Sequence, residues 1–241
     1  MNEEFLNRLL RPVHPSWRNL LCEQLQNLDE AFAEELEADP HWFPGADRCL
    51  AAFSVSRFDV RVVWLGESPY PRQESATGLS FQDGAVDEMF RSDGRLAVRI
   101  NRATSLRNVL KACFVATDRL AVGQTSSDHV RLMDHNGLVT RLGEIFDRGQ
   151  QSGWLWLNAG LSLRPELPRT AQIRNWEPLV NAVLQDVSAR GARVALMGKF
   201  AERFEPVCHN PLVSVHPRRE EFMVNQDVTG LLRHWRNLIE D

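Results

Sequence analysis

The sequence predicts an α/β protein of three layers, α/β/α, in which helices cover both faces of a central four-stranded parallel sheet. Four short apolar runs indicate the strands, over residues 60–65, 154–157, 194–197 and 212–215. Their hydrophobicity is continuous rather than alternating, which is typical of parallel strands buried on both faces. Segments with helical patterns separate these runs, so we expect βαβ units with right-handed crossovers.

The spacing of apolar residues assigns the helices. Residues 17–36 carry apolar side chains at helical spacing, and Ser16 after Pro15 is the expected N-cap. Segment 82–104 is polar and rich in arginine, and we expect it to be a loop. We expect a single domain over residues 1–241, with an N-terminal helical segment, residues 1–41, packed on it. Further helices are expected over residues 48–53, 105–116, 137–147, 176–189 and 200–206.

Length and composition are those of a soluble globular protein. The 241 residues can bury a sizeable core, and 43% of them are hydrophobic while 25% are charged. No apolar run is long enough to span a bilayer, and the acidic N-terminus lacks the apolar region of a signal peptide. We therefore expect a cytoplasmic protein with no membrane partner.

Cysteine spacing and net charge exclude some functional classes and leave others open. Cys22, Cys49, Cys113 and Cys208 are scattered and form no C-x-x-C pair, so zinc, iron–sulfur and disulfide sites are not expected. The net charge of −4 gives no global argument for nucleic acid. All but two of the 28 basic residues are arginine, which binds phosphate well where it is clustered.

Each predicted strand is followed by residues that can do chemistry. After the first strand comes Gly66-Glu67-Ser68-Pro69-Tyr70-Pro71, a turn whose two prolines exclude helix and strand and which carries one carboxylate. The other strands end in Asn158-Ala159-Gly160, Gly198-Lys199 and His216-Pro217. Because the carboxyl ends of parallel strands meet at one edge of a sheet, we expect a ligand site there. Neither G-x-G-x-x-G nor a P-loop pattern is present, so this is not a standard nucleotide-binding loop.

In order and spacing, these segments resemble the uracil-DNA glycosylase superfamily, most closely its common bacterial and eukaryotic branch. The resemblance runs from about Trp42 to the C-terminus and implies the fold of that superfamily. The branch carries the motifs G-Q-D-P-Y-H, G-L-[AS]-F, L-L-L-N and H-P-S-P-L. The corresponding segments here are Gly66-Glu67-Ser68-Pro69-Tyr70-Pro71, Gly78-Leu79-Ser80-Phe81, Leu155-Trp156-Leu157-Asn158 and His216-Pro217-Arg218-Arg219-Glu220.

The resemblance implies a role for four side chains. Phe81 would stack on a flipped-out base, and Asn158 would read its Watson–Crick edge. Tyr70 would stand against C5 of a pyrimidine, and His216 would hydrogen-bond the base O2. Taken singly, each residue has an ordinary structural explanation: Phe81 in the core, Asn158 on a loop backbone, Tyr70 in packing and His216 in a turn. Only their joint order favours the functional interpretation.

The catalytic loop departs from the common branch. Ser68 occupies the place of its water-positioning aspartate, and a hydroxyl cannot supply the negative charge that a cationic sugar needs. Glu67 lies one residue earlier, where the iron–sulfur branch of the superfamily has the glutamate of its G-E-[AS]-P-G loop. We therefore expect Glu67 to be the catalytic carboxylate, with Ser68 beside it, and the alternative is an inactive site or one that uses another group. The cysteines do not match a cluster-binding pattern, so no cofactor is expected.

The apolar wedge of the family is missing after the His-Pro pair. Arg218 and Arg219 precede its position and are expected to grip phosphate or to fill the gap left by the flipped base. Phe222 or Met223 is a candidate for a displaced wedge, although Phe222 is equally expected in the core.

Further contacts to DNA are expected where helices begin. Ser105 starts the helix after the long insertion, and the Gly198 amide region is a better phosphate contact than Lys199. The insertion itself, residues 82–104, carries four arginines that are candidates for shaping base selection or contacting DNA: Arg91, Arg95, Arg99 and Arg102.

The expected function is that of a monofunctional DNA glycosylase in base-excision repair. It would bind DNA as a monomer, flip out a base and hydrolyse its N-glycosidic bond, with uracil as the default substrate and no metal or redox cofactor. Two alternatives stay open. The altered segment 82–104 would suit a glycosylase for a modified pyrimidine of phage DNA, acting in anti-phage defence. Ser68 would suit an inactive DNA-binding protein of the same fold.

Overall fold

The four predicted strands form one parallel sheet. A computed structural model describes residues 1–240 and gives the sheet order β2-β1-β3-β4. The strands are β1 Val62–Gly66, β2 Trp154–Asn158, β3 Arg193–Met197 and β4 Leu212–Ser214. In β1, Val62 lies opposite Trp154 of β2 on one side and Arg193 of β3 on the other. The predicted fold class is therefore confirmed.

Helices and short 3-10 turns, labelled η, make up the rest of the regular structure. The α-helices are α1 Glu3–Leu9, α2 Arg18–Gln26, α3 Glu30–Ala38, α4 Val98–Arg102, α5 Thr104–Ala116, α6 Ser127–Leu132, α7 Leu142–Gln151, α8 Arg169–Ala189, α9 Lys199–Glu202, α10 Gln226–Leu232 and α11 Arg236–Ile239. The 3-10 turns are η1 Pro15–Trp17, η2 Ala51–Ser54, η3 Glu205–Val207, η4 Glu220–Val224 and η5 Arg233–Trp235.

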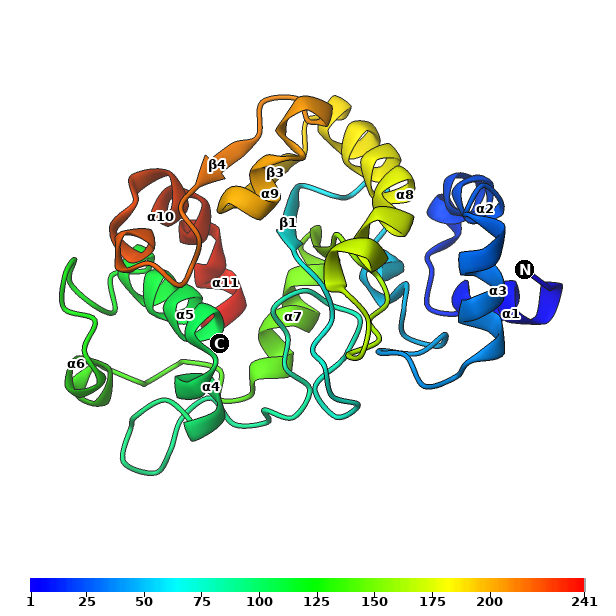
Figure 1. The fold of residues 1–241 in the computed structure, drawn as a ribbon. Coiled ribbons are helices and arrows are strands. Elements are labelled where there is room, and N and C mark those ends of the chain that lie inside the picture. Colours follow the sequence, from blue (N-terminus) through cyan, green and yellow to red (C-terminus); the bar gives the residue numbers. More distant parts are fainter. Residues whose placement is uncertain (241) are drawn as a thin grey trace.

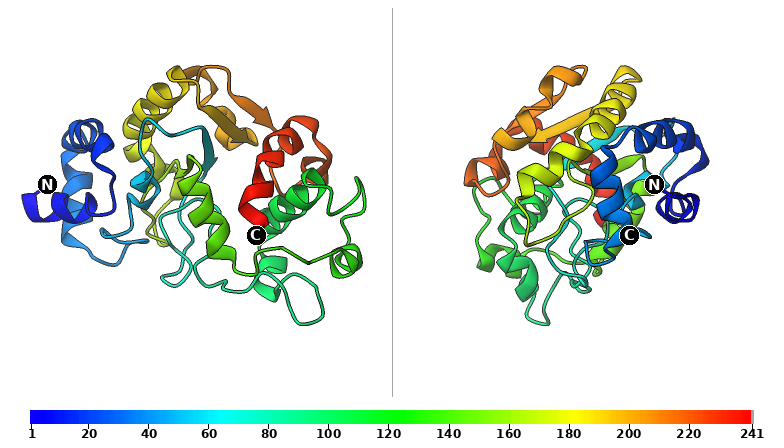
Figure 2. Two further views of the ribbon diagram at one scale, coloured as in Figure 1. Left: turned by 180° about the vertical axis from the view of Figure 1, so that it is seen from behind. Right: turned by 45° about the vertical axis from the view of Figure 1, so that its right-hand side comes forward.

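Helices lie on both sides of the sheet. In Figure 1, α8 lies on one side of β1, while α5, α10 and α11 lie on the other. The N-terminal helices α2 and α3 lie outside α8, and both views of Figure 2 show the same order of layers. Contacts between α2 and α8 and between α10 and α5 agree with this arrangement. The carboxyl ends of the strands are thus framed by helices on either side.

The long helix expected over residues 17–36 is in fact broken. Asp29 ends the continuity because its side chain accepts a hydrogen bond from the Phe32 amide at 3.0 Å and caps α3. Ser16 is not the N-cap of a helix, since its hydroxyl instead accepts a hydrogen bond from the Arg57 amide at 2.8 Å. The His14 side chain caps the 3-10 turn that precedes α2. The amphipathic spacing continued through the break, so periodicity alone concealed it.

Other boundaries differ from the sequence-based expectations. The helix expected over 137–147 begins later, as α7, and the one expected over 176–189 begins earlier, directly after Pro168. The short helix expected over 48–53 is a turn followed by η2, and the one over 200–206 is divided into α9 and η3. Segment 82–104 is not wholly a loop, because it contains α4 and an isolated bridge between Phe90 and Leu96.

An aromatic cluster in the core surrounds the central strand. Trp64 of β1 is fully buried, and its ring lies 5.8 Å from that of Trp235 and 6.0 Å from that of Trp154, between centroids. The ring of Phe81 meets Trp64 edge-on at 5.8 Å. Such aromatic pairs add to the free energy of burial. One partly buried residue of the candidate site is thereby attached to the core.

Three classes of feature were searched for over residues 1–240. None of the helices there is both long and apolar enough to cross a membrane. The four cysteines are unbonded, with Cys49 and Cys113 buried and the other two half-buried. Within the same residues, no three His, Cys, Asp or Glu side chains are grouped so that they could bind a metal ion.

Gly78 illustrates how tightly the chain before Phe81 is packed, and it gives a stability prediction. Gly78 has φ +91°, and a Cβ atom there would lie 2.0 Å from the Arg48 carbonyl oxygen. Gly123 has φ +80° but nothing within 4 Å of such a Cβ. We expect Gly123→Ala to cost only the backbone strain, about 1–2 kcal/mol. Gly78→Ala should cost a further ~1–3 kcal/mol because the backbone must move.

Urea unfolding of the two variants and the wild type measures this difference. Gly123→Ala is the matched control, because both glycines share the left-handed conformation. Equal losses of unfolding free energy in the two variants would show that the close approach at Gly78 has no energetic consequence.

Candidate active site

The ends of β1 and β2 form the base of the site. Gly66 lies opposite Asn158, and the hydrogen-bond ladder continues beyond the strands. The Ala159 amide donates to the Gly66 carbonyl and the Gly160 amide to the Glu67 carbonyl, each at 2.9 Å. The turn that carries Glu67 is therefore fixed to the turn that follows Asn158.

Gly66 is where three segments meet most closely. A Cβ atom at this position would lie 2.6 Å from Asn158 Oδ1 and 2.7 Å from Ser80 Cβ, so only glycine fits without a shift. Ser80 is attached to both strands, because its amide donates to the Trp156 carbonyl and its hydroxyl to the Trp64 carbonyl, both at 3.0 Å. The fold thus brings Asn158 and the residue before Phe81 to the same point.

Phe81 has an unusual backbone conformation. Its φ of +65° lies in the left-handed region, which is uncommon for a residue with a bulky side chain. The ring is only partly buried and packs one edge against Trp64. A strained, partly exposed aromatic residue next to an anchored serine is consistent with a stacking platform.

Asn158 is buried, with 3% of its surface exposed. Its side-chain amide has no hydrogen-bond partner among residues 1–240. The structural explanation, that Asn158 secures a loop backbone, is therefore not supported. A buried amide without a partner costs about 1–3 kcal/mol, and such groups are kept mainly where a ligand completes them.

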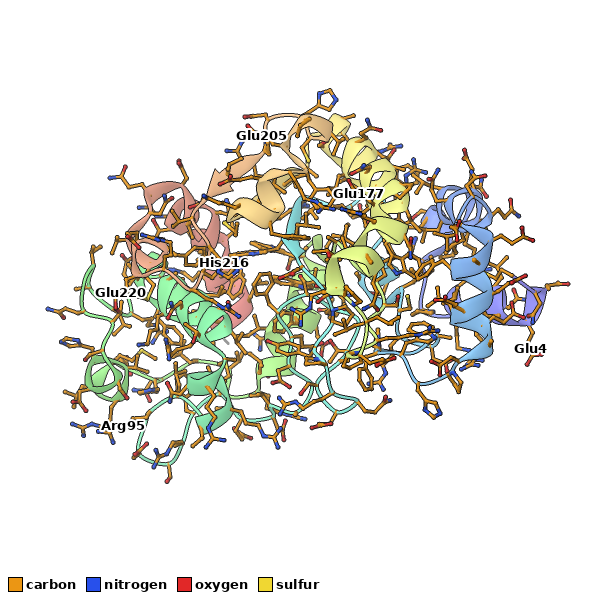
Figure 3. The ribbon with its side chains drawn as sticks, viewed as in Figure 1. Glu4, Arg95, Glu177, Glu205, His216 and Glu220 are labelled. Atoms are coloured by element: carbon orange, nitrogen blue, oxygen red, sulfur yellow. The ribbon has the colours of Figure 1, made fainter. Side chains whose placement is uncertain are left out.

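His216 lies between β4 and α10, on the segment where Figure 3 also labels Glu220. The Arg218 amide donates to His216 Nδ1 at 3.0 Å, so the neutral ring carries its proton on Nε2. Burial and the positive charge of Arg218 lower the pKa of His216, and the negative charge of Glu67 partly opposes them. The ring is therefore neutral at pH 7 and offers one N–H donor.

Two further contacts hold the backbone around His216. A Cβ atom on Gly198, which has φ +87°, would lie 2.7 Å from His216 Cβ, so the glycine permits this close approach. The buried side chain of Asn108, on α5, donates to the Pro217 carbonyl at 2.7 Å. The histidine is thus fixed from two sides, by the β3–α9 turn and by α5.

The turn after β1 exposes its carboxylate. The Glu67 side chain is 44% exposed, and its Oε2 lies 3.9 Å from the Arg169 guanidinium at the start of α8. The charge of Glu67 is felt by His216, so both side chains lie near the same region. Ser68 is half-buried, and its hydroxyl has no hydrogen-bond partner among the residues that the structure describes.

Tyr70, the only tyrosine, is largely buried beside Glu67 and Ser68. Burial raises the pKa of Tyr70 to about 12, and the charge of Asp83 raises it further while that of Arg72 lowers it. The phenol is therefore neutral over the whole physiological range.

The predicted DNA contacts differ in how free they are. Lys199 and Arg218 are exposed and form no ion pair within residues 1–240, whereas Arg219 pairs with Glu221 at 2.9 Å. Ser105 lies half-buried in the first turn of α5. The expectation for the Gly198 amide is wrong as regards its own N–H, because that group donates to the Ser214 carbonyl at 2.7 Å.

The structure also corrects the candidates for a wedge. Phe222 is fully buried and Met223 nearly so, which places both in the core. The exposed apolar residue of this turn is Val224, with 44% of its surface accessible. The sequence alone could not separate these three neighbours, since a 3-10 turn places successive side chains in different directions.

The arginines of segment 82–104 divide into two pairs. Arg91 and Arg95 both form ion pairs with Asp93, and Arg95 also pairs with Asp128. Arg99 and Arg102 form no ion pair with any described residue and lie on α4. Only the second pair is therefore free to meet a phosphate.

Three residues near the site were not anticipated from the sequence: Asn108, Arg169 and Asp83. Asn108 interrupts the apolar face of α5, which is a signal that could have been read. The pairing of Arg169 with Glu67 and the burial of Asp83 depend on contacts between distant segments and left no local pattern.

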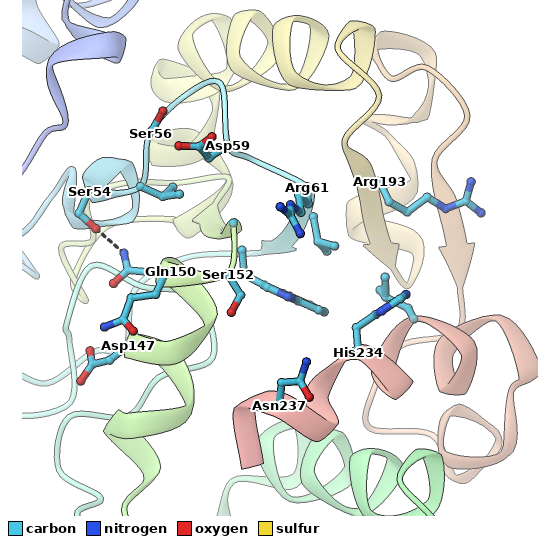
Figure 4. Close-up of a pocket in the computed structure, with 16 residues that line it drawn as sticks. Ser54, Ser56, Asp59, Arg61, Asp147, Gln150, Ser152, Arg193, His234 and Asn237 are labelled. Atoms are coloured by element: carbon cyan, nitrogen blue, oxygen red, sulfur yellow. Dashed lines mark hydrogen bonds between the residues drawn. The ribbon is translucent and has the colours of Figure 1, made fainter. Parts of the chain in front are cut away.

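The largest cavity is at the other end of the sheet. It has a volume of about 1120 Å³ and reaches the first residues of β1, β2 and β3, so it is separate from the carboxyl-end site. Figure 4 shows that polar side chains from the chain before β1, from α7 and from the C-terminal helices surround it, among them Asp59, Arg61, Asp147, Ser152, His234 and Asn237.

Comparison with known proteins gives a consistent result for sequence relatives. No protein-family profile matches the chain. The uracil-DNA glycosylase of Amoebophilus asiaticus is 26% identical over 219 residues, which cover 85% of this chain and 84% of that protein. The uracil-DNA glycosylase of Mycobacteroides abscessus is 28% identical over 214 residues, with 85% and 80% covered.

Solved structures extend the comparison. The crystal structure of mimivirus uracil-DNA glycosylase, 14% identical, has a TM-score of 0.57 over 87% of this chain and 71% of that one, a likeness of fold. The crystal structure of the wild-type UNG from Nitratifractor salsuginis has a TM-score of 0.89 at 32% identity and covers 100% of both chains. With sequence and structure alike over the full length, this chain belongs to the uracil-DNA glycosylase superfamily.

Proposed function

We propose that this protein is a monofunctional DNA glycosylase that flips out a base, with uracil as the default substrate, and hydrolyses its N-glycosidic bond. The observation that carries the proposal is the buried, unpartnered amide of Asn158 at the strand edge shared with Phe81. The relatives named above are uracil-DNA glycosylases, which supports the same assignment. We expect the protein to act on DNA as a monomer and to leave an abasic site.

Asn158 and Phe81 supply the recognition of the base in this proposal. An amide offers both a donor and an acceptor, which matches the O4 and N3–H edge of uracil. Phe81, attached to Trp64 and to the Ser80 anchor, supplies a surface on which the base stacks. Together these contacts offset part of the free energy of unstacking the base from DNA. Tyr70, neutral and largely buried, would stand against C5.

His216 and Glu67 address the two charges that develop as the bond breaks. The leaving base becomes anionic, and the Nε2–H of neutral His216 would donate to its O2. The sugar becomes cationic, and the Glu67 carboxylate would stabilise it or orient the attacking water. Ser68 has no charge to offer, so we assign it no more than a hydrogen bond to that water. Arg218 and Lys199, free of ion pairs within residues 1–240, would contact phosphates, with Arg219 and Ser105 nearby.

A panel of duplex and single-stranded DNAs tests the proposal. The DNAs would carry uracil, other damaged bases or phage-type modified pyrimidines, and alkaline cleavage would reveal abasic sites. Release of uracil supports the proposal. Release of a modified pyrimidine alone would favour the defence function, for which the comparisons offer no support. DNA binding without any abasic product would favour the inactive alternative.

The first prediction concerns the carboxylate. Glu67→Gln keeps the size of the side chain but removes its charge, so base release should fall at least about a hundredfold. Glu74→Gln is the matched control, since Glu74 is exposed and approaches only Arg72, at 3.9 Å. Single-turnover rates measure the effect, and binding to abasic DNA shows that the fold is kept. Wild-type rates in Glu67→Gln would assign the carboxylate role to another residue.

The second prediction concerns the pH dependence of His216. Its pKa is lowered below the ordinary 6.5, so the ring stays neutral as pH falls to 6.5 and gains a proton only below that. Protonation of Nδ1 would set two donors against each other at the Arg218 contact. The rate of base release should therefore fall on the acid side of pH 6.5.

Two arginine variants test the cause of this shift. Arg218→Gln removes a charge that lowers the pKa of His216, so the acid limb of the rate profile should move to higher pH. Arg219→Gln is the matched control, because that guanidinium pairs with Glu221 and does not contribute to the shift. NMR titration of His216 gives the same pKa independently. Superposable profiles for Arg218→Gln and the wild type would refute the electrostatic explanation.

A further inference from the structure

Asp83 is the only fully buried acidic residue among residues 1–240, with 3% of its surface exposed. Its Oδ1 accepts a hydrogen bond from the Ala85 amide at 3.0 Å. Its Oδ2 lies 3.9 Å from the Arg72 guanidinium, which is too far for a hydrogen bond. A buried carboxylate with a single hydrogen bond is costly, so its presence calls for an explanation.

The backbone places Asp83 between two parts of the candidate site. Asp83 pairs with Ala76 in an isolated antiparallel bridge, and the Gly84 amide donates to the Ser75 carbonyl at 3.0 Å. The strand formed by Ser75 and Ala76 follows the Tyr70 turn, whereas Asp83 follows Phe81 by two residues. Asp83 therefore lies where the Tyr70 loop and the Phe81 segment are joined.

The charge of Asp83 reaches the phenol of Tyr70. Asp83 raises the pKa of Tyr70 and Arg72 lowers it, so both charges face the ring from their own segments. An aspartate that pairs loosely with Arg72 thus holds the end of the Tyr70 loop against the segment that carries Phe81.

We propose that Asp83 is a positioning residue that fixes Tyr70 relative to Phe81 and thereby sets which pyrimidines, with or without a substituent at C5, the pocket accepts. The proposal rests on the proposed function, since it takes Tyr70 to face C5 and Phe81 to stack on the base. Asp83 itself touches no reacting atom. Its removal should loosen the wall formed by Tyr70 and so admit a base with a 5-methyl group.

Tyr70 can be observed directly, because it is the only tyrosine of the chain. The near-ultraviolet absorbance of its phenolate, read after rapid jumps to alkaline pH and before unfolding, gives its pKa. Asp83→Asn removes the negative charge and should lower this pKa from about 12. Arg72→Gln removes the positive charge and should raise it. Simple loosening of the loop would instead lower the pKa in both variants, because it would admit water to the ring.

Base selection is the second readout. We expect Asp83→Asn to retain release of uracil and to lose roughly tenfold or more of the preference for uracil over thymine, which is the order of discrimination that one methyl group provides. Asp87→Asn is the matched control, since Asp87 lies in the same segment but is exposed and pairs only with Arg141. It should leave both the Tyr70 titration and the preference unchanged.

The outcomes separate this proposal from the proposed function. An unchanged Tyr70 titration in Asp83→Asn, or a fall in both Asp83→Asn and Arg72→Gln, would overturn the positioning role whatever the enzyme does. An unchanged preference for uracil in an active Asp83→Asn would overturn its effect on base selection. A wild-type protein that releases no base from any DNA would instead overturn the proposed function and the base-selection part, while the titration would still decide whether Asp83 acts on Tyr70.

Discussion

The close approach at Gly66 is the constraint on which the candidate site depends. Asn158 and Ser80 both occupy the space that a side chain at residue 66 would need. Ser80 remains there because it is hydrogen-bonded to β1 and β2 at once. Since Phe81 follows directly, its left-handed backbone conformation is a consequence of that attachment. A single glycine therefore sets the relative positions of the amide and the aromatic ring.

A second glycine has the same effect on the other half of the site. Gly198 lets the segment after β4 come so close to the β3–α9 turn that a Cβ atom would collide with His216. The Arg218 amide then selects the tautomer of the ring, and Asn108 holds the next carbonyl. Backbone contacts, rather than long side chains, fix the histidine, and such contacts are the more rigid kind of support for a functional group.

The sequence predicted the sheet well because each strand is a compact apolar run, a local property. It also identified Glu67, Asn158 and His216 as strand-end residues, since parallel topology follows from the βαβ pattern. It failed where the outcome depends on distant partners. Asp29 breaks the N-terminal helix by capping α3, and the Gly198 amide is occupied by Ser214. The role of Asp83 was invisible because its burial arises from a bridge to Ala76.

The position of the carboxylate is the remaining question about the catalytic loop, and the backbone around it bears on the answer. The Gly160 amide binds the Glu67 carbonyl, so the extended ladder includes residue 67 and ends there. In an extended chain successive side chains point to opposite sides, and a carboxylate at 67 therefore starts from a different side than one at 68. Glutamate is one methylene longer than aspartate, which gives its carboxylate more reach from that starting point. The charge of Glu67 is felt at His216, so the displaced carboxylate still acts on the region where the sugar and the leaving base would lie. A carboxylate at 67 and a hydroxyl at 68 are thus compatible with the same chemistry as an aspartate at 68, provided that the Arg169 guanidinium, 3.9 Å away, does not neutralise the Glu67 charge when DNA is bound. A phosphate offers Arg169 a better partner than an exposed carboxylate does, because it accepts bidentate hydrogen bonds from a guanidinium, and binding of DNA would then release Glu67 toward the sugar.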